Sequence, residues 1–370
     1  MPLEPRPEIK NLKVCHHGGK NYAELQAIGI APEAILDFSV CTNPFMPPQA
    51  IKELHIGSAA IEQYPDSEAT QLKRILSQKL SISPDTILVG SGSTELIRLI
   101  AFAYFRHGDS ILIWEPTYGE YEIISKITGA KPRKQWMKAE DSFALQTEKA
   151  VDFIKQYQPR AVFICNPNNP TGKYLSYQEI EMVLDAMDDG LLILDQAYIA
   201  FVEASRSSVN LISRGNVIIV RSMTKDYGLT GLRLGYTIAS REITDTLRRV
   251  CPPWNVNAIA QKAGAMVLED DGYLEQTMGK IKEAKLYLTS ELSRLGFQPL
   301  PSDTHYFLVE VGNARLFRSA LLKYGIQVRD CTSFGLPEYI RISTRTLPEC
   351  KRLIAAIRKL KNKGEIDVGK

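Results

Sequence analysis

Short apolar runs alternate with polar turn clusters and helix-like patterns through most of the chain. The runs are rich in β-branched and aliphatic residues and lie at 87–89, 111–114, 161–165, 191–194 and 217–220. After the first run, apolar residues recur at helical spacing from Leu96 to Ala103. Apolar runs of this length predict buried strands, and strands that alternate with helices predict a mostly parallel sheet covered on both faces. We therefore expect an α/β fold.

The pattern changes after residue 254. A long amphipathic stretch at 257–295 is followed by Gly296, as a helix that ends at a glycine would be. Next we predict strands at 306–311, 326–329 and 339–343, a helix at 314–324, and a last helix from about residue 347 with Thr346 and Pro348 as start signals. This second pattern of helices and strands indicates a smaller α+β unit. We predict an N-terminal arm at 1–46 that packs with the small unit and the functional site, a large unit at 47–270 and a small unit at 271–370.

Composition and charge exclude several classes of protein. With 44% hydrophobic and 24% charged residues, the chain is neither disordered, collagen-like nor a coiled coil. Its 45 basic and 42 acidic residues nearly balance, so the chain lacks the excess of positive charge that is typical of nucleic-acid-binding proteins. No apolar run approaches the ~18 residues of a membrane span, and residues 1–13 lack the apolar stretch of a secretion signal. We expect a cytoplasmic protein that binds neither nucleic acid nor membrane.

The six cysteines are dispersed, without a C-x-x-C pair or a histidine spacing typical of zinc. In a cytoplasmic chain of this size such cysteines are typically buried reduced thiols. The sequence therefore predicts no metal site.

Polar clusters follow five of the predicted strands, at 90–94, 115–118, 166–172, 195 and 221–225. Ligands of open α/β sheets bind outside the carboxyl ends of the strands, so we expect these clusters to meet in one crevice. The first cluster, Gly-Ser-Gly-Ser-Thr before a helix, offers backbone N–H groups to a phosphate. Glu95 stands where the third glycine of a dinucleotide fingerprint belongs, which favours a smaller phosphorylated cofactor.

Two charged residues follow apolar strands. An unpaired carboxylate at Asp195 would be costly there, so a cation should face it, although a helix cap or a structural ion pair would also account for it. Lys225 follows the strand at 217–220, and a partly buried lysine with a lowered pKa is what Schiff-base chemistry requires. Pyridoxal phosphate needs such an amine for its aldehyde, a carboxylate for its ring nitrogen, an aromatic face, and donors for its oxygens. The residues of the five clusters can supply each of these.

The order of motifs over nearly the whole chain resembles that of the fold-type I pyridoxal-phosphate enzymes, close to the histidinol-phosphate aminotransferase group. The matching segments are 64–66, 116–118, 166–172, 195–198, 222–225, 231–236 and Arg341. The resemblance implies a mostly parallel sheet of the seven-stranded type flanked by helices, pyridoxal 5'-phosphate bound to the large unit, and a homodimer.

The resemblance also implies a role for each matching residue. The expected catalytic residues are Lys225 on the aldehyde, Asp195 on the ring nitrogen and Tyr118 stacked on the ring. The phenolic oxygen would be held by Asn169 and Tyr198. The phosphate would be held by Ser93, Thr94, Ser222, Thr224 and Arg233, and by Tyr64 from the partner subunit. Gln196 departs from the pattern of the group, which has an acidic residue at that position.

The N-terminal segment looks like that of the threonine-phosphate decarboxylases of cobalamin biosynthesis, which share the aminotransferase fold. The likeness rests on residues 16–19, 35–39 and 43–44. It implies substrate contacts from His17, Asn169, Arg329, Arg341 and Arg345, and converging arginines suit a substrate with both a phosphate and a carboxylate. Cys41 and Lys20 depart from the decarboxylase pattern.

We therefore expect a carboxy-lyase that converts L-threonine phosphate or L-serine phosphate to an amino-alcohol phosphate. The alternative is an aminotransferase of the histidinol-phosphate type, or one acting on another phosphorylated or phosphonated amino acid, because the same residues serve both reactions. A third hypothesis is a nucleotide-dependent oxidoreductase or a non-catalytic binding protein. The missing third glycine and the pair of Lys225 and Asp195 disfavour it.

Overall fold

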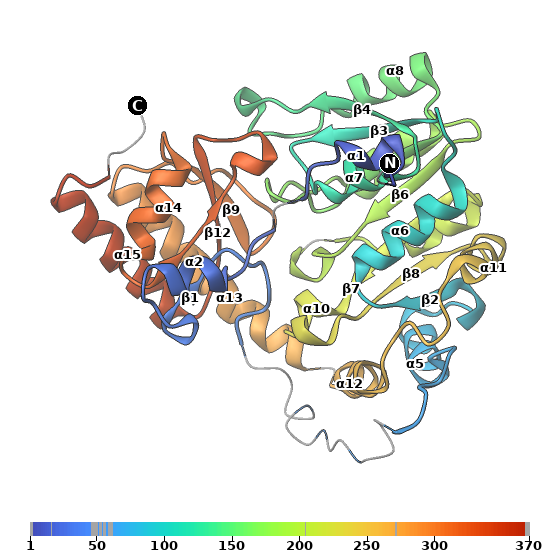
Figure 1. Cartoon of the computed structure of the whole chain (residues 1–370), viewed down its shortest axis with the longest axis horizontal. Coiled ribbons are helices and arrows are strands. Elements are labelled where there is room, and N and C mark those ends of the chain that lie inside the picture. Colours follow the sequence, from blue (N-terminus) through green and yellow to red (C-terminus); the bar gives the residue numbers. More distant parts are fainter. Residues whose placement is uncertain are drawn as a thin grey trace.

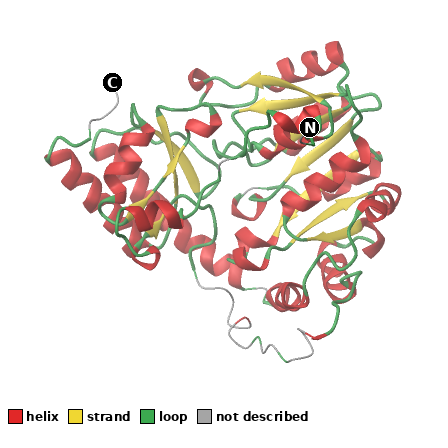
Figure 2. Ribbon diagram, in the orientation of Figure 1, coloured by secondary structure: helices red, strands yellow, loops and turns green. Residues whose placement is uncertain are grey.

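The buried apolar runs form one seven-stranded sheet in the computed structural model, which describes residues 3–15, 17–45, 51, 54, 57, 62–203, 205–270 and 272–366. The strand order is β2-β8-β7-β6-β5-β3-β4, and helices lie on both faces of the sheet (Figure 1, Figure 2). The strands are β2 (Ile87–Gly90), β3 (Ser110–Glu115), β4 (Lys131–Trp136), β5 (Ala161–Cys165), β6 (Leu191–Asp195), β7 (Val217–Ser222) and β8 (Gly235–Ala239). Six of the strands run in one direction, and β8 runs in the opposite direction. The predicted α/β fold with a mostly parallel sheet is confirmed.

Alternate residues of the strands pack on opposite faces of this sheet. Leu192 and Leu194 of β6 contact one group of helices, and Leu191 and Ile193 contact the other. The first group is α5 (Thr70–Leu80), α8 (Thr147–Tyr157), α9 (Tyr177–Asp185) and α12 (Ala258–Glu269). The second is α6 (Ser93–Tyr104), α7 (Glu120–Ile127) and α11 (Arg241–Val250). Each buried Leu or Ile contributes about 1.5–3 kcal/mol, which is why these strands are almost wholly apolar.

A second core lies in the C-terminal part of the chain (Figure 1). Its antiparallel sheet has the order β11-β12-β9, formed by β9 (Tyr306–Glu310), β11 (Arg329–Asp330) and β12 (Tyr339–Ser343). Three helices pack on it, α13 (Tyr273–Arg294), α14 (Ala314–Leu322) and α15 (Leu347–Asn362). The last helix begins as predicted, because Thr346 and Glu349 form a capping box around the first turn that contains Pro348.

Two predicted elements differ in the structure. The amphipathic stretch at 257–295 is two helices, because α12 ends at Glu269 and α13 begins at Tyr273, whose N–H donates to Asp270 Oδ1 (3.1 Å). The predicted strand at 326–329 is two short strands in different sheets. The first, β10 (Ile326–Gln327), pairs with β1 (Leu36–Asp37), and β11 pairs with β12.

The N-terminal arm contacts both cores. Its first helix, α1 (Pro7–Lys10), lies beside α7, where the guanidinium of Arg6 donates to the carbonyl of Ile127 (2.7 Å). Farther on, α2 (Tyr22–Ala27) is held to α14 by a two-bond ion pair between Glu24 and Arg318. Residues 46, 47 and 271, where the predicted units begin or end, lie outside the described residues, and the division into three units stays a prediction. Among the described helices, none is both long and apolar enough to span a bilayer.

Candidate active site

A cavity of about 390 Å³ lies where the carboxyl ends of the large sheet meet the arm and the second core. Its wall includes residues that follow β3, β5, β6 and β7. The structure brings nine of the predicted site residues to this wall: His17, Thr94, Tyr118, Asn169, Tyr198, Lys225, Arg233, Arg329 and Arg341. The convergence expected from the strand order therefore occurs.

Asp195 ends β6 as a buried carboxylate, 3% exposed. The hydroxyl of Tyr121 donates to its Oδ2 (2.7 Å) and the N–H of Ala197 to its Oδ1 (2.9 Å). Burial raises the pKa of Asp195, although these donors oppose the effect. No ion pair to this carboxylate occurs within the described ranges. A buried carboxylate without a cation is costly, so the position suits a protonated ring nitrogen.

Lys225 lies in the short helix α10 (Met223–Asp226) that follows β7. The N–H of Asn43 in the arm donates to its carbonyl (2.8 Å) and fixes the backbone there. Burial lowers the pKa of Lys225, and the charges of Arg233 and Arg341 lower it further. No hydrogen bond to its Nζ is present among the residues that the structure describes. The side chain is thus an amine that loses its proton readily, as a nucleophile for an aldehyde must.

The turn between β2 and α6 leaves room for an anion. Gly92 caps α6 with φ +83°, and a Cβ on it would lie 2.8 Å from Nη2 of Arg233. A Cβ on Gly235 in β8 would lie 3.0 Å from the backbone nitrogen of Ser93. Glycine at both positions therefore keeps the guanidinium and the first N–H groups of a twelve-residue helix clear of side chains. Such a helix start is suited to a phosphate.

Two pairs of hydroxyl groups from the strand-end segments are hydrogen-bonded to each other. Oγ1 of Thr94 and the phenolic oxygen of Tyr118 are 2.9 Å apart, and Oγ of Ser222 and Oγ1 of Thr224 are 2.7 Å apart. The amine of Lys225, the buried carboxylate, the phenol ring and the glycine-lined turn supply every contact that pyridoxal phosphate needs. The residues of the site therefore fit that cofactor.

Arg341 brings a buried positive charge from β12 to the same cavity, at 4% exposure. Its guanidinium donates to Oδ1 of Asn169 and to the carbonyl of Ser39 (2.6 Å), and lies 5.5 Å from the ring centre of Tyr306. Its buried Nε has no hydrogen-bond partner. All these partners are neutral, and Arg341 forms no ion pair with another described residue. A buried guanidinium without a counter-ion is suited to bind an anionic substrate.

Arg329 and His17 connect the second core to the arm. Nη1 of Arg329 donates to the carbonyl of His17 (3.0 Å), and Nη2 donates to Oγ of Ser333 (2.7 Å). Nε2 of His17 lies 3.2 Å from Oε1 of Glu120. Hydrogen bonds with Cys15 and Glu120 raise the pKa of His17 to about 9. A second cationic group therefore stands beside Arg329.

The other predicted residues do not line the cavity. Ser93, Asp195, Ser222 and Thr224 belong to the segments just described, next to it. Arg345 instead donates to the carbonyl of Asp37 (3.1 Å) and pairs with Glu349 (2.8 Å), which is a structural arrangement at the start of α15. The contact of Arg345 with a substrate therefore has no support in this geometry.

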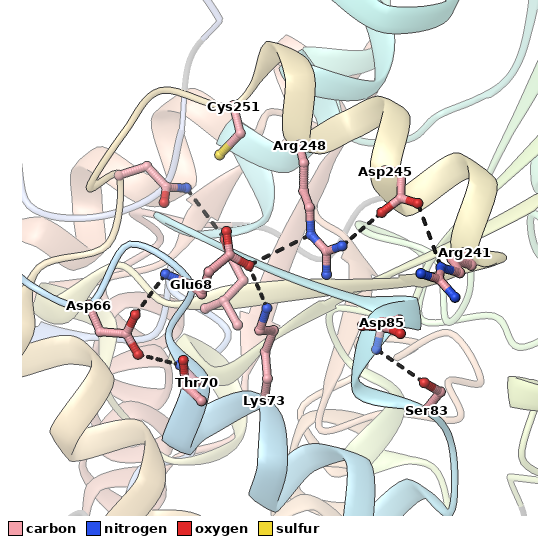
Figure 3. Close-up of polar contacts among 12 residues, drawn as sticks. Asp66, Glu68, Thr70, Lys73, Ser83, Asp85, Arg241, Asp245, Arg248 and Cys251 are labelled. Atoms are coloured by element: carbon pink, nitrogen blue, oxygen red, sulfur yellow. Dashed lines mark hydrogen bonds and ion pairs between the residues drawn. The ribbon is translucent and has the colours of Figure 1, made fainter.

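Tyr64 is 78% exposed and stacks on Trp254 at a centroid distance of 4.2 Å. Figure 3 shows how the chain just after it is held. Asp66 accepts from the N–H groups of Glu68 (2.9 Å) and Thr70 (2.7 Å), and Glu68 pairs with a lysine of α5 and an arginine of α11. Within one chain, Tyr64 is not part of the cavity wall.

Several residues of the site were not identified from the sequence. Tyr121, which donates to Asp195, lies three residues after Tyr118 at the start of a helix, so that spacing could have indicated it. Ser333 and Phe334 join the wall from a turn after β11, and no pattern in the sequence points to them. Cys15 joins it from the arm.

The three departures from the family patterns have different surroundings. Gln196 is buried, donates to Oγ of Ser208 (3.1 Å) and accepts from Arg221 (3.1 Å), so both the nitrogen and the oxygen of its amide are hydrogen-bonded. Lys20 donates to the carbonyl of Pro32 (2.6 Å), within the arm. Cys41 lies in the cavity wall.

Comparison with known proteins gives a consistent result. The sequence profile described as "Aminotransferase class I and II" matches residues 33–357. The histidinol-phosphate aminotransferase of Moorella thermoacetica is 32% identical over 92% of this chain and 89% of its own, and further curated relatives of 30–32% identity carry the same name. The crystal structure of histidinol-phosphate aminotransferase from Sinorhizobium meliloti with pyridoxal-5'-phosphate is 24% identical, covers 97% of both chains and has a TM-score of 0.86. These findings confirm the expected fold-type I fold, and the profile match confirms pyridoxal phosphate as the cofactor.

The expectation of decarboxylation is wrong, because the curated relatives are named aminotransferases. The L-threonine-O-3-phosphate decarboxylase of Porphyromonas gingivalis is a structural neighbour, with 26% identity, coverage of 88% of this chain and 99% of its own, and a TM-score of 0.76. The His-Gly-Gly turn that suggested decarboxylation has a packing reason. A Cβ on Gly18 would lie 2.5 Å from the carbonyl oxygen of Ser39, and Gly19 has φ +111°. His16, which precedes this turn, lies outside the described residues.

Proposed function

Because the chain belongs to the aminotransferase class I and II family, we propose that it transfers the amino group of a phosphorylated amine of the histidinol-phosphate type to a 2-oxo acid. The observation that carries the proposal is the charge of the cavity. Lys225, Arg233, Arg329 and Arg341 line it, and no acidic residue does so among those described. Cations gathered around one nucleophilic amine suit a substrate and a co-substrate that both carry anions.

Pyridoxal phosphate, when bound, supplies an aldehyde for amines and a ring that accepts electrons. In our proposal Lys225 Nζ binds that aldehyde, the carboxylate of Asp195 keeps the ring nitrogen protonated, and Tyr118 covers one ring face. The phenolic oxygen takes hydrogen bonds from Tyr198 and from the amide of Asn169, whose Oδ1 already accepts from Arg341. The phosphate is held by the N-terminus of α6 and by Ser93, Thr94, Ser222, Thr224 and Arg233.

Lys225 also moves the proton in this proposal. With pyridoxal phosphate bound, Nζ of Lys225 would take the proton from the substrate Cα and pass it to the aldehyde carbon of the cofactor. A lysine serves as such a general base only if its pKa lies near the working pH. Burial and the two nearby guanidinium groups lower the pKa of Lys225 in that direction.

The arginines orient the substrate. Arg341, buried and without a counter-ion, takes an anionic group at the end of the cavity formed by β12, and Arg329 takes a second contact beside it. Both guanidinium groups are already held by hydrogen bonds to neutral backbone or hydroxyl oxygens, so little ordering is needed on binding. A phosphate in the amino donor and a carboxylate in the oxo acid can use the same positions in turn.

We also propose that the enzyme is a homodimer in which Tyr64 contacts the cofactor phosphate of the partner subunit. Two exposed stacked rings, Tyr64 and Trp254, are an apolar surface that a partner could cover. Sedimentation should give twice the mass of the chain, and Tyr64→Phe should weaken cofactor binding without changing that mass. A monomer with full activity would contradict this part of the proposal.

The test is an assay with L-histidinol phosphate as donor and 2-oxoglutarate as acceptor. We expect one glutamate per donor consumed, and no sustained turnover when the oxo acid is omitted. Arg341→Gln should raise KM roughly 10- to 100-fold, as expected for loss of a charge-assisted contact, while exposed Arg358→Gln should leave it unchanged. Release of carbon dioxide from threonine phosphate at a higher kcat/KM, without any oxo acid, would refute the proposal.

A further inference from the structure

Three residues of metal-binding type lie close together at the edge of the cavity, and two of them line it. Cys15 and His17 come from the arm and line the cavity, and Glu120 is the first residue of α7. The sulfur of Cys15, a ring nitrogen of His17 and a carboxylate oxygen of Glu120 all lie within 4.8 Å of one another. Thiolate, imidazole and carboxylate are the ligand types of zinc in proteins. The amino transfer proposed above uses neither Cys15 nor Glu120.

The spacing of the ligand atoms is close to what a zinc ion requires. Zinc bonds of about 2.0–2.3 Å in a tetrahedron place ligand atoms roughly 3.3–3.8 Å apart. Nε2 of His17 and Oε1 of Glu120 are already 3.2 Å apart. A Cβ on Gly119 would lie 2.9 Å from the sulfur of Cys15, so the glycine before α7 makes the room that this sulfur occupies. Because the sulfur of Cys15 lies within 4.8 Å of both atoms, a movement of about 1 Å would complete the geometry.

The carboxylate of Glu120 is held in place for such a role. Its side chain is 7% exposed, and its Oε2 accepts from Nη2 of Arg98 (3.3 Å). The other oxygen, Oε1, faces His17. A second residue that binds the outer side of a ligating carboxylate is typical of metal sites, where its loss lowers affinity about 10- to 100-fold.

We propose that Sγ of Cys15, Nε2 of His17 and Oε1 of Glu120 bind one zinc ion, with a fourth position open to water or to an anion in the cavity. The ion ties the arm to α7, and because two of its ligands line the cavity, it narrows the space available to substrate. This inference does not rest on the proposed amino transfer, because Cys15, His17 and Glu120 can bind a metal ion whether or not that reaction takes place.

Cobalt(II) added to the metal-free holoenzyme provides the spectroscopic probe. We expect one cobalt ion per chain, with a sulfur-to-cobalt absorption band that one equivalent of zinc abolishes and magnesium does not. Cys15→Ser should abolish the band, and Glu120→Gln and Arg98→Ala should weaken binding at least about tenfold. Cys251→Ser, a change at another partly exposed cysteine, should leave the titration unchanged. An unchanged band in Cys15→Ser would overturn the proposal.

Alkylation of the unmodified protein gives a second readout that needs no variant. Zinc should protect Cys15, but not Cys251, from iodoacetamide, as peptide masses would show. Equal protection of both cysteines, or of neither, would overturn the proposal. Zinc should also lower the turnover of the unmodified enzyme more than that of Cys15→Ser. If the chain shows no amino transfer, the cobalt and alkylation results still decide the metal site, so the two proposals fail separately.

Discussion

Lys225 is the residue on which the proposed chemistry depends most. Its side chain is partly buried near positive charges, and its Nζ has no hydrogen-bond partner within the described part of the chain. We predict that Lys225→Ala loses the covalent link to the cofactor and its visible absorption. Turnover should fall by about 10²–10⁴-fold or more, since both nucleophile and proton carrier are lost. Lys282→Ala, on an exposed face of α13, is the matched control. Full activity of the Lys225 variant would remove it from the mechanism.

We predict that Asp226, the next residue, makes the stability of the protein depend on pH. Burial raises its pKa to about 7, and its Oδ1 is buried without a partner. An unfolded chain releases this proton near pH 4, so between about pH 4 and 7 the folded state binds more protons than the unfolded state. The free energy of unfolding should therefore fall as the pH rises through this window, by roughly 1 to 4 kcal/mol, and stay constant above it.

Asp226→Asn should remove that contribution. Thermal unfolding of the holoenzyme at pH 5 and pH 8 measures it: the variant should gain stability relative to the unmodified protein at pH 8 and little at pH 5. Asp188→Asn, at an exposed position, should show no such difference. An Asp226 variant that follows the unmodified protein at both pH values would show that this carboxyl is not the cause.

At the scale of elements, the turn from β2 into α6 should control cofactor affinity. Gly92 has φ +83°, and a Cβ there would meet the guanidinium of Arg233 at 2.8 Å. A strained residue of this kind costs about 1–3 kcal/mol, so Gly92→Ala should weaken pyridoxal-phosphate binding roughly 5- to 150-fold in a titration of the apoenzyme. Gly231→Ala, where a Cβ would meet nothing within 4 Å, is the control. Equal affinities in the two variants would contradict the assigned phosphate site.

Most strands of the large sheet could be predicted from the sequence, whereas β4 and β8 could not. The strands β3, β5, β6 and β7 are apolar along their length because helices cover both sides. The edge strand β4 has the sequence KPRKQW and is partly exposed, so it has no apolar pattern to detect. The strand β8 has no helix between it and the motif at 231–234 and runs against its neighbours, which an alternation of strand and helix does not predict.

At the scale of the whole molecule, the cavity joins segments that are far apart in the sequence. Motifs at strand ends identified its cofactor side, because all these strands end at one edge of the sheet. The other side of the cavity is formed by the arm and the second core, and its residues meet only through the packing of separate units, which motifs do not reveal. That is why Ser333 was missed, Arg345 was assigned to substrate although it pairs with Glu349, and the grouping of Cys15 with Glu120 was not foreseen.

The small excess of positive charge over the whole chain conceals a strong local asymmetry. The formal net charge is +3, yet the cavity around the amine of Lys225 is lined by three arginines and His17, and its described wall has no carboxylate. Association with anionic substrates should therefore weaken as ionic strength rises, because screening acts on the charges that attract them.

The most direct test of the account is to follow one nitrogen atom. The holoenzyme is incubated with L-histidinol phosphate labelled with a heavy nitrogen isotope in its amino group, together with 2-oxoglutarate, and the products are analysed by mass spectrometry. The account predicts that the label appears in glutamate in equal amount to the donor consumed, with no carbon dioxide released. Unlabelled glutamate, or consumption of a phosphorylated amino acid with release of carbon dioxide and no labelled glutamate, would contradict it.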